Sequence, residues 1–305
     1  MVSAVEESTL GSRMMPFGSI LGHDLRGLWS GWLVRLWLAG TVILTFLLTV
    51  GNWGQFRDGP LIASVLFPYL VFPWFFVVVV LGVQTVSGSQ AEALADGILS
   101  RPIGRLEYLF ATWLARVVLV LGVFLVVVVP FIVVIVLAKR PVPEDHVTVF
   151  GVLSALFVVA LVLTFLVTLG FLAGIVLHRA MLAVVVLVFV WYPIGLILNT
   201  FSLEEFSPIS LSRAITTQLR QSLHASGDAE PDQVAIQEAE DLSRQVDHFL
   251  SVFSGAKPAP KPGKPQFFEG RQFDDFSVFR VLLGYGLPSL IALGITAACF
   301  YRRDL

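Results

Sequence analysis

Residues 113–138 read WLARVVLVLGVFLVVVVPFIVVIVLA, an apolar run in which the charged residue Arg116 stands near the beginning. A helix of about 20 consecutive apolar residues is enough to cross the hydrocarbon core of a bilayer. The chain of 305 residues is 56% hydrophobic and 14% charged, whereas a soluble domain carries about 25% charged residues. The bilayer is the solvent that absorbs this much apolar surface, so we predict an all-α membrane protein.

Other runs of the same kind extend the prediction to six transmembrane helices. The six predicted spans are approximately 32–53, 60–86, 113–138, 148–177, 180–200 and 279–300. Pro68 and Pro73 fall inside the second run, where each removes a backbone donor, and we expect them to kink that helix. Residues 1–31 are of mixed polarity, unlike a cleaved signal peptide, so we expect the first span to stay in the mature protein.

The distribution of Lys and Arg predicts the orientation. With six spans both termini lie on one side of the membrane, and that side would hold Arg13, Arg26, Arg35, Arg101, Arg105, Arg116, Arg179, Arg302 and Arg303. The short loops on the other side hold Arg57, Lys139 and Arg140. Because short basic loops stay in the cytoplasm, we predict cytoplasmic termini and a multi-pass protein of the cell membrane.

Three polar segments flank or separate the spans. In the cytoplasmic segment 1–31, five apolar residues at helical spacing predict an amphipathic helix in the membrane interface, with a loosely ordered tail as the alternative. These residues are Ile20, Leu21, Leu25, Leu28 and Trp29. Spans one to five and the loop 87–112 make up 32–200, and the sixth span with a basic cytoplasmic tail makes up 279–305.

The long polar segment 201–278, between the fifth and sixth spans, is predicted to be an extracytoplasmic loop. Its apolar residues recur at intervals of three and four, which predicts one amphipathic helix. They are Ala239, Leu242, Val246, Phe249 and Phe253. A Pro-rich spacer follows at 255–265.

Several functional classes lack the residues that they need. The cores of the predicted spans carry no ionisable side chain, which argues against an ion-coupled carrier, and Arg35, Arg116 and Arg280 lie near span ends, where they can snorkel to the interface. Gly263-Lys264 is followed by Pro265, so no Walker A loop forms, and no catalytic motif is present. We therefore expect the chain not to be an enzyme and to hold no cofactor or metal, and the absence of a basic run argues against a nucleic-acid partner.

The loop between the second and third spans is the most charged short loop. Pro102 predicts a stop between a short helix at about 90–99 and a helix that starts near Arg105. On physical grounds alone this loop could equally be a solvated connection whose arginines fix the topology.

Three motifs point to a family. Leu99-Ser-Arg-Pro-Ile-Gly-Arg-Leu-Glu-Tyr-Leu109 follows Glu92, Ser207-Pro-Ile-Ser-Leu-Ser-Arg213 follows the fifth span, and Phe300-Tyr-Arg-Arg-Asp-Leu305 closes the chain. Together they resemble ABC-2 type exporter permeases, and most closely those that serve nitrous-oxide reductase maturation. Ser207 stands where the family usually has Asn, and the insertion at about 214–270 is longer than is usual in the family.

The resemblance implies that the loop between spans two and three is a coupling helix that docks on an ABC ATPase subunit, with a smaller contact between spans four and five. The implied docking residues are Glu92, Asp96, Arg101, Pro102, Arg105, His178 and Arg179. It further implies that ATP and Mg²⁺ bind to the partner ATPase and that a second permease copy or homologue completes the transporter. A membrane anchor or assembly subunit, binding an extracytoplasmic partner through 201–278, is the alternative function.

Overall fold

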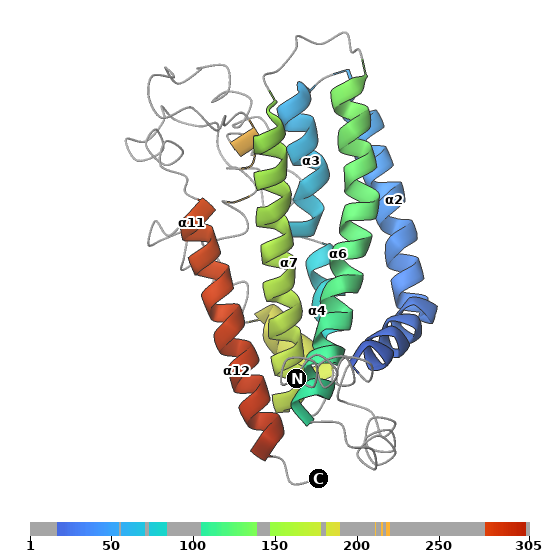
Figure 1. Cartoon of the computed structure of the whole chain (residues 1–305). Coiled ribbons are helices and arrows are strands. Elements are labelled where there is room, and N and C mark those ends of the chain that lie inside the picture. Colours follow the sequence, from blue (N-terminus) through green and yellow to red (C-terminus); the bar gives the residue numbers. More distant parts are fainter. Residues whose placement is uncertain are drawn as a thin grey trace, which may run out of the picture.

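The structure is a computed structural model that describes residues 17–54, 56–70, 73–83, 105–138, 147–177, 181–189, 211, 215, 218–219 and 278–302. All regular structure in these residues is helical, which confirms the predicted class. The named elements are α2 (Trp32–Asn52), α3 (Asp58–Leu70), α4 (Trp74–Val83), α6 (Arg105–Leu137), α7 (Val149–Leu177), α11 (Val278–Val281), the π-helical turn η3 (Leu282–Gly286) and α12 (Leu287–Arg302). Residues 17–30 and 181–189 are helical as well (Figure 1), and so are the isolated described residues Leu211, Ile215, Gln218 and Leu219.

Within the described residues, five helical segments are long and apolar enough to cross a bilayer. They are Trp32–Asn52, Asp58–Val83, Leu106–Leu137, Val149–Leu177 and Val278–Tyr301. They coincide with the first four predicted spans and the sixth. The predicted fifth span, 180–200, is described over 181–189, where it is helical, and its remainder lies outside the described residues.

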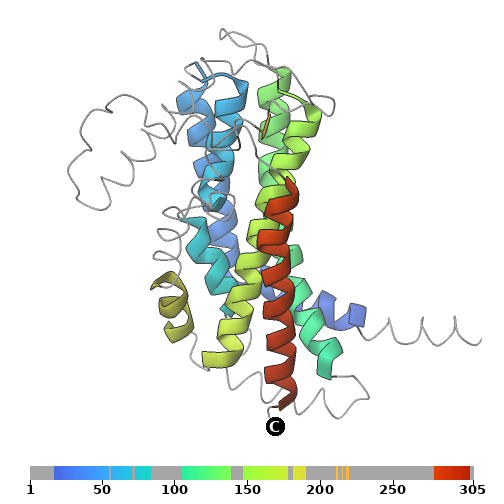
Figure 2. The ribbon, with the colours of Figure 1, turned by 90° about the vertical axis from the view of Figure 1, so that its left-hand side faces the viewer.

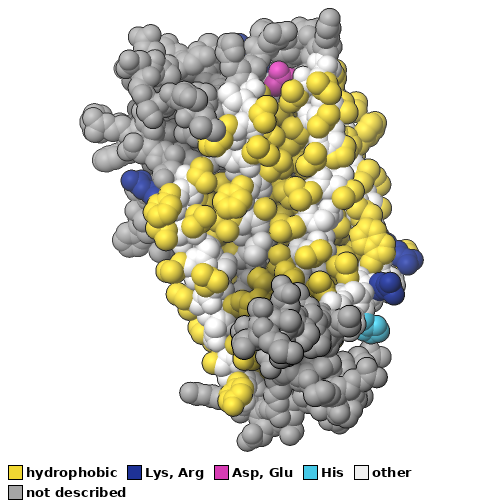
Figure 3. Space-filling view, in the orientation of Figure 1, with side chains coloured by type: hydrophobic (Ala, Val, Ile, Leu, Met, Phe, Trp, Pro, Cys, Tyr) yellow, Lys and Arg dark blue, Asp and Glu magenta, His cyan; other side chains and the backbone are white. Residues whose placement is uncertain are grey.

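The surface of the bundle fits a lipid environment. Figure 3 shows one face on which apolar side chains cover the described elements from end to end. Large apolar side chains such as Phe46, Val126 and Leu290 are more than half exposed. A soluble monomer rarely exposes an apolar surface of this extent, whereas lipid tails cover it without cost.

The second predicted span is described as two helices, and residues 71–72 between them lie outside the described residues. α3 ends at Leu70 and α4 begins at Trp74, directly after Pro73. A proline has no backbone N–H and its ring clashes with the preceding turn, so one continuous helix would be strained there. Pro68, by contrast, is accommodated inside α3.

The central helix is α7, which packs against α4, α6, α12 and α3. Figures 1 and 2 agree that α12 runs alongside it. α7 is apolar on every side, and fifteen of its residues are buried. The main core lies where α7 meets α3, α4 and α6, around large buried side chains such as Tyr69, Phe124 and Leu166.

The ends of the helices alternate as in an up-and-down bundle. One end of the bundle, the lower end in Figure 1, holds the start of α2 and α6 and the end of α4, α7 and α12. The residues at these helix ends are Trp32, Arg105, Val83, Leu177 and Arg302. We call this end the terminal end, because the first and last described helices lie there. The predicted cytoplasmic side corresponds to this end.

The chain changes ends between the helix at 181–189 and Leu211. The described chain leaves α7 at Leu177 and resumes at Met181, at the terminal end. Leu219 lies at the opposite end, because its carbonyl accepts a hydrogen bond over 3.0 Å from the backbone N–H of Thr148, just before the start of α7. The 29 residues of α7 extend over about 44 Å. A further crossing between these points is what the six-span topology requires.

Residues 17–30 form a helix, at the place where the sequence predicts an amphipathic helix in the membrane interface. Ile20 is buried, and Leu25 and Leu28 pack against the core. The helix meets α2 at Gly31, which has an extended backbone (φ −65°, ψ 137°). The helix at 17–30 therefore lies across the foot of α2 (Figure 1).

Candidate functional site

The predicted docking residues lie mostly outside the described part of the chain. This applies to Glu92, Asp96, Arg101, Pro102, His178 and Arg179. Arg105 is the first residue of α6, so the helix begins where the Pro102 stop predicted, and the part of the predicted loop from 105 to 112 forms the first turns of the span.

The structure does place the ends of the two predicted docking segments. The chain leaves α4 at Val83 and re-enters at Arg105, and it leaves α7 at Leu177 and re-enters at Met181. All four residues lie at the terminal end of the bundle. Both predicted contacts with an ATPase thus emerge from the same end, which is the arrangement that a single docking surface requires.

Beside this end lies a buried polar cluster that connects three helices. The Thr112 hydroxyl on α6 donates a hydrogen bond to the Asp24 carboxylate on the N-terminal helix over 2.9 Å. One turn further along α6, Arg116 is 6% exposed and its guanidinium lies over the Phe171 ring of α7, 5.9 Å from the centroid.

The position of Arg116 corrects a prediction made from the sequence. Arg116 was expected to snorkel to the interface from the end of a span, but α6 begins at Arg105 and places Arg116 three turns inside the helix. Its Nη1 donates to the Thr112 carbonyl in the same helix. A buried cation requires such partners because desolvation penalises its charge.

Asp24 was missed as a functional residue, although the sequence holds a signal for it. Ile20, Asp24 and Leu28 are spaced by four residues and so share one helical face. A carboxylate in the middle of an apolar face predicts a buried polar partner. The sequence does not say that this partner is Thr112, 88 residues away.

The start of α6 is fixed from the α7 side as well. The Trp113 indole N–H donates to the Thr168 hydroxyl over 3.1 Å. Leu109 on α6 and Phe171 and Ile175 on α7 form a small apolar cluster, against which Phe300 of α12 packs. The first turns of α6 therefore contact three other helices, namely the N-terminal helix, α7 and α12.

α4 and α7 are in backbone contact near the same end. A Cβ atom added to Gly82 would lie 2.8 Å from the Val167 carbonyl oxygen, and one added to Gly174 would lie 2.7 Å from the Val83 carbonyl oxygen. Small residues allow such close packing, which drives helix association in lipid. The helix that ends at the first predicted docking segment is therefore in direct backbone contact with the helix that ends at the second.

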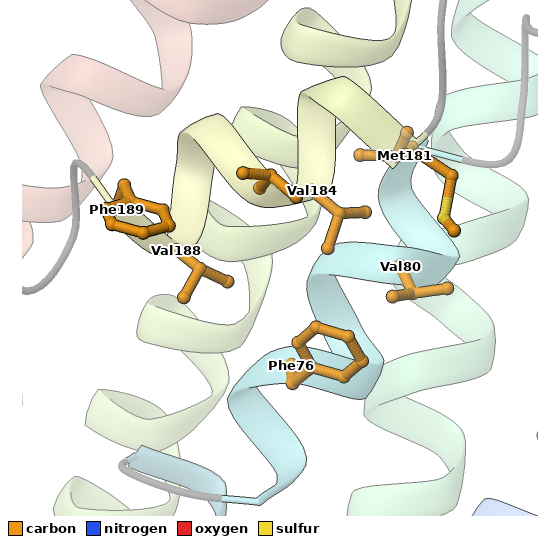
Figure 4. Close-up of a pocket in the computed structure, with 8 residues that line it drawn as sticks. Phe76, Val80, Met181, Val184, Val188 and Phe189 are labelled. Carbon is orange, nitrogen blue, oxygen red and sulfur yellow. The ribbon is translucent and has the colours of Figure 1, made fainter.

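An apolar groove of 450 Å³ lies between α4 and the helix at 181–189. Phe76 and Val80 of α4 face Met181, Val184 and Val188 across it (Figure 4). Its lining offers no acid, base or nucleophile. Among the described residues, no group of three His, Cys, Asp or Glu side chains is placed to hold a metal ion.

The chain matches the family described as ABC-2 family transporter protein over residues 62–305. The chain belongs to the ABC-2 transporter family. Comparison with curated proteins and with solved structures gave no significant match.

As an ABC-2 family protein, the chain is a multi-pass membrane permease, and its family in general works with a partner ATPase subunit. The matched region includes both predicted docking segments and every described span except α2 and the first four residues of α3. It excludes the helix at 17–30. The contact of Asp24 with Thr112 therefore joins a segment outside the family match to a helix inside it.

Proposed function

We propose that this chain is the membrane-spanning permease subunit of an ATP-driven ABC exporter in the cell membrane. It couples ATP hydrolysis on a separate ATPase subunit to the movement of a substrate across the bilayer. Family membership over residues 62–305 is the observation that carries this proposal. The working unit is two permeases with two ATPases, because alternating access requires two bundles that move against each other.

The geometry of the terminal end supports a coupling mechanism. ATPase closure would push on the segment between Val83 and Arg105, which continues directly into α6. The cluster at Thr112, Arg116 and Phe171 and the glycine contact of α4 with α7 would carry that push into the bundle. Packed helices transmit such a displacement as rigid bodies, because their interfaces do not deform continuously.

The docking residues in this proposal are those that the family resemblance implies. Charged side chains on a short helix form the charge-assisted contacts by which such a helix docks. They are Glu92, Asp96, Arg101 and Arg105, with Pro102 as the helix stop and His178 and Arg179 as the second contact. Among ABC-2 permeases, the three motifs favour the type that serves nitrous-oxide reductase maturation.

Isolation of the complex tests the proposal. A tagged chain extracted from its own membrane in mild detergent should bring down an ATP-binding protein in equal amount, and the complex should hydrolyse ATP. Recovery of extracytoplasmic proteins alone would overturn the exporter and favour an anchor or assembly subunit that binds partners through 201–278. A chain with Glu92→Ala and Arg101→Ala, which should lose the ATPase, provides the matched control.

A further inference from the structure

The orientation of the N-terminal helix is fixed by its inner face. Leu25 and Leu28 pack against the core, and Asp24 accepts the hydrogen bond from Thr112. The helix therefore cannot rotate about its axis without breaking that bond and exposing these side chains. The contacts of the inner face therefore also fix which side chains of the helix point outward.

That outer face and the foot of α2 present a surface of defined chemistry. His23, Arg26 and Trp29 are exposed on the helix, and Trp32 and Arg35 are exposed just beyond the corner at Gly31. Trp29 is 52% and Trp32 77% exposed. We call these five residues the basic corner. Figure 3 shows basic (Lys or Arg) and His side chains gathered at the right-hand edge of the face, below the middle and on the side of α2.

The charges of the basic corner are not neutralised within the described part of the protein. Neither Arg26 nor Arg35 forms an ion pair with a described residue. Asp24, the acidic residue of the same helix, faces inward to Thr112. The acidic side chain visible in Figure 3 lies at the opposite end of the bundle.

The basic corner also lies at a defined level in the membrane. α2 contains 21 residues from Trp32 to Asn52, which corresponds to about 31 Å of helix. The hydrocarbon core is about 30 Å thick, so Trp32 falls at its boundary when Asn52 lies at the other. Tryptophan is enriched at this boundary, and arginine there extends its guanidinium to the headgroups.

We propose that the basic corner binds the phosphate headgroups of anionic phospholipids in the leaflet at the terminal end. Arg26 and Arg35 hold the phosphates, because a guanidinium matches phosphate oxygens with two parallel hydrogen bonds. Trp29 and Trp32 anchor the surface at the base of the headgroups. This inference does not depend on the proposed transport function, since it needs only the membrane position of α2.

Local lipid quenching tests the proposal on the full chain. Ser30 is exposed and lies one helical turn after Arg26, so a Ser30→Cys variant on a Cys299→Ser background carries a bimane fluorophore beside the basic corner. The labelled protein is reconstituted in phosphatidylcholine vesicles with a small fraction of nitroxide-labelled phosphatidylglycerol or nitroxide-labelled phosphatidylcholine. The ratio of the two quenching efficiencies reports the local preference for the anionic headgroup.

We expect phosphatidylglycerol to quench more strongly, and the preference to fall by about five-fold for each arginine replaced by Gln at positions 26 and 35. Arg57→Gln, which removes the same charge at the opposite end of the bundle, should leave the ratio unchanged. Equal quenching by both lipids in the unsubstituted protein, or an equal loss with Arg57→Gln, would overturn the proposal. Protection of the fluorophore from both lipids would overturn it too, because a protein partner would then cover the surface.

Discussion

Gly82 of α4 and Gly170 of α7 are in backbone contact: a Cβ atom added to Gly82 would lie 3.0 Å from the Cα of Gly170. The converse distance, from a Cβ on Gly170 to the Cα of Gly82, is 3.1 Å. Both atoms belong to helical backbone, so neither side can yield without separating the helices. The contact joins the helices that end at the two predicted docking segments.

A methyl group at this contact should therefore destabilise the bundle. We expect Gly82→Ala and Gly170→Ala each to lower the free energy of unfolding by about 1–3 kcal/mol, the usual cost of overpacking. Thermal unfolding in detergent, followed by loss of the monodisperse elution peak, measures the effect. Gly122→Ala in α6 is the control, because nothing lies within 4 Å of its added Cβ, and it should be neutral or slightly stabilising.

The hydrogen bond between Asp24 and Thr112 should hold the N-terminal helix on the bundle. Asp24→Asn and Thr112→Val each weaken or remove a hydrogen bond to a charged group, which is worth about 1.5–3 kcal/mol. We expect both to lower thermal stability and to increase proteolysis near residue 30. As a control, Glu107→Gln neutralises an exposed acidic residue in the first turn of α6, and it should change neither the thermal stability nor the proteolysis. Equal behaviour of Asp24→Asn and Glu107→Gln would contradict the role of this bond.

The predicted docking loop should be required for coupling and dispensable for folding. Glu92→Ala and Arg101→Ala should insert and elute normally but lose the ATPase and transport-linked ATP hydrolysis, because each removes a charge-assisted contact. Pro102→Ala should be milder, since it deletes no contact. Arg57→Ala at the other end should retain full activity. Full ATPase binding in the Glu92 and Arg101 variants would reduce the loop to a topological signal.

The six-span topology is testable by cysteine accessibility. On a Cys299→Ser background, which removes the exposed native thiol, Ser100→Cys and Arg303→Cys should react with an impermeant reagent from the cytoplasm alone. Asp228→Cys should react from the outside alone. Labelling of positions 100 and 228 from the same side would mean an even number of crossings between them, which would contradict the three crossings of the six-span topology.

Gly151 should be required for residues 218–219 of the predicted extracytoplasmic loop to pack against the start of α7. A Cβ atom there would overlap the carbonyl oxygens of Gln218 and Leu219, beside the hydrogen bond from Thr148 to Leu219. We expect Gly151→Ala to detach this segment and to speed its cleavage by added protease several-fold. Gly294→Ala in α12, whose added Cβ meets open space, should leave the cleavage rate unchanged.

Local chemistry accounts for the features that were predicted correctly. Apolar length located the five long apolar helices to within a few residues, except that α6 begins at Arg105 and not at about 113. Pro73 marked the break before α4 because proline cannot continue a helix. The same reasoning placed the start of α6, and apolar spacing found the helix at 17–30.

By itself, then, the sequence determined that this protein crosses the membrane several times and roughly where most of its long apolar helices lie, because both depend on neighbouring residues. The tertiary structure alone decided which helices meet: Asp24 with Thr112, Gly82 with Gly170 and Thr148 with Leu219. In a bilayer a helix such as α7 is apolar on the lipid side and on the protein side alike, so hydrophobic periodicity does not mark its buried face. Partners are selected by close packing and by a few polar bonds between residues far apart in the chain, and these become visible only when the helices are assembled.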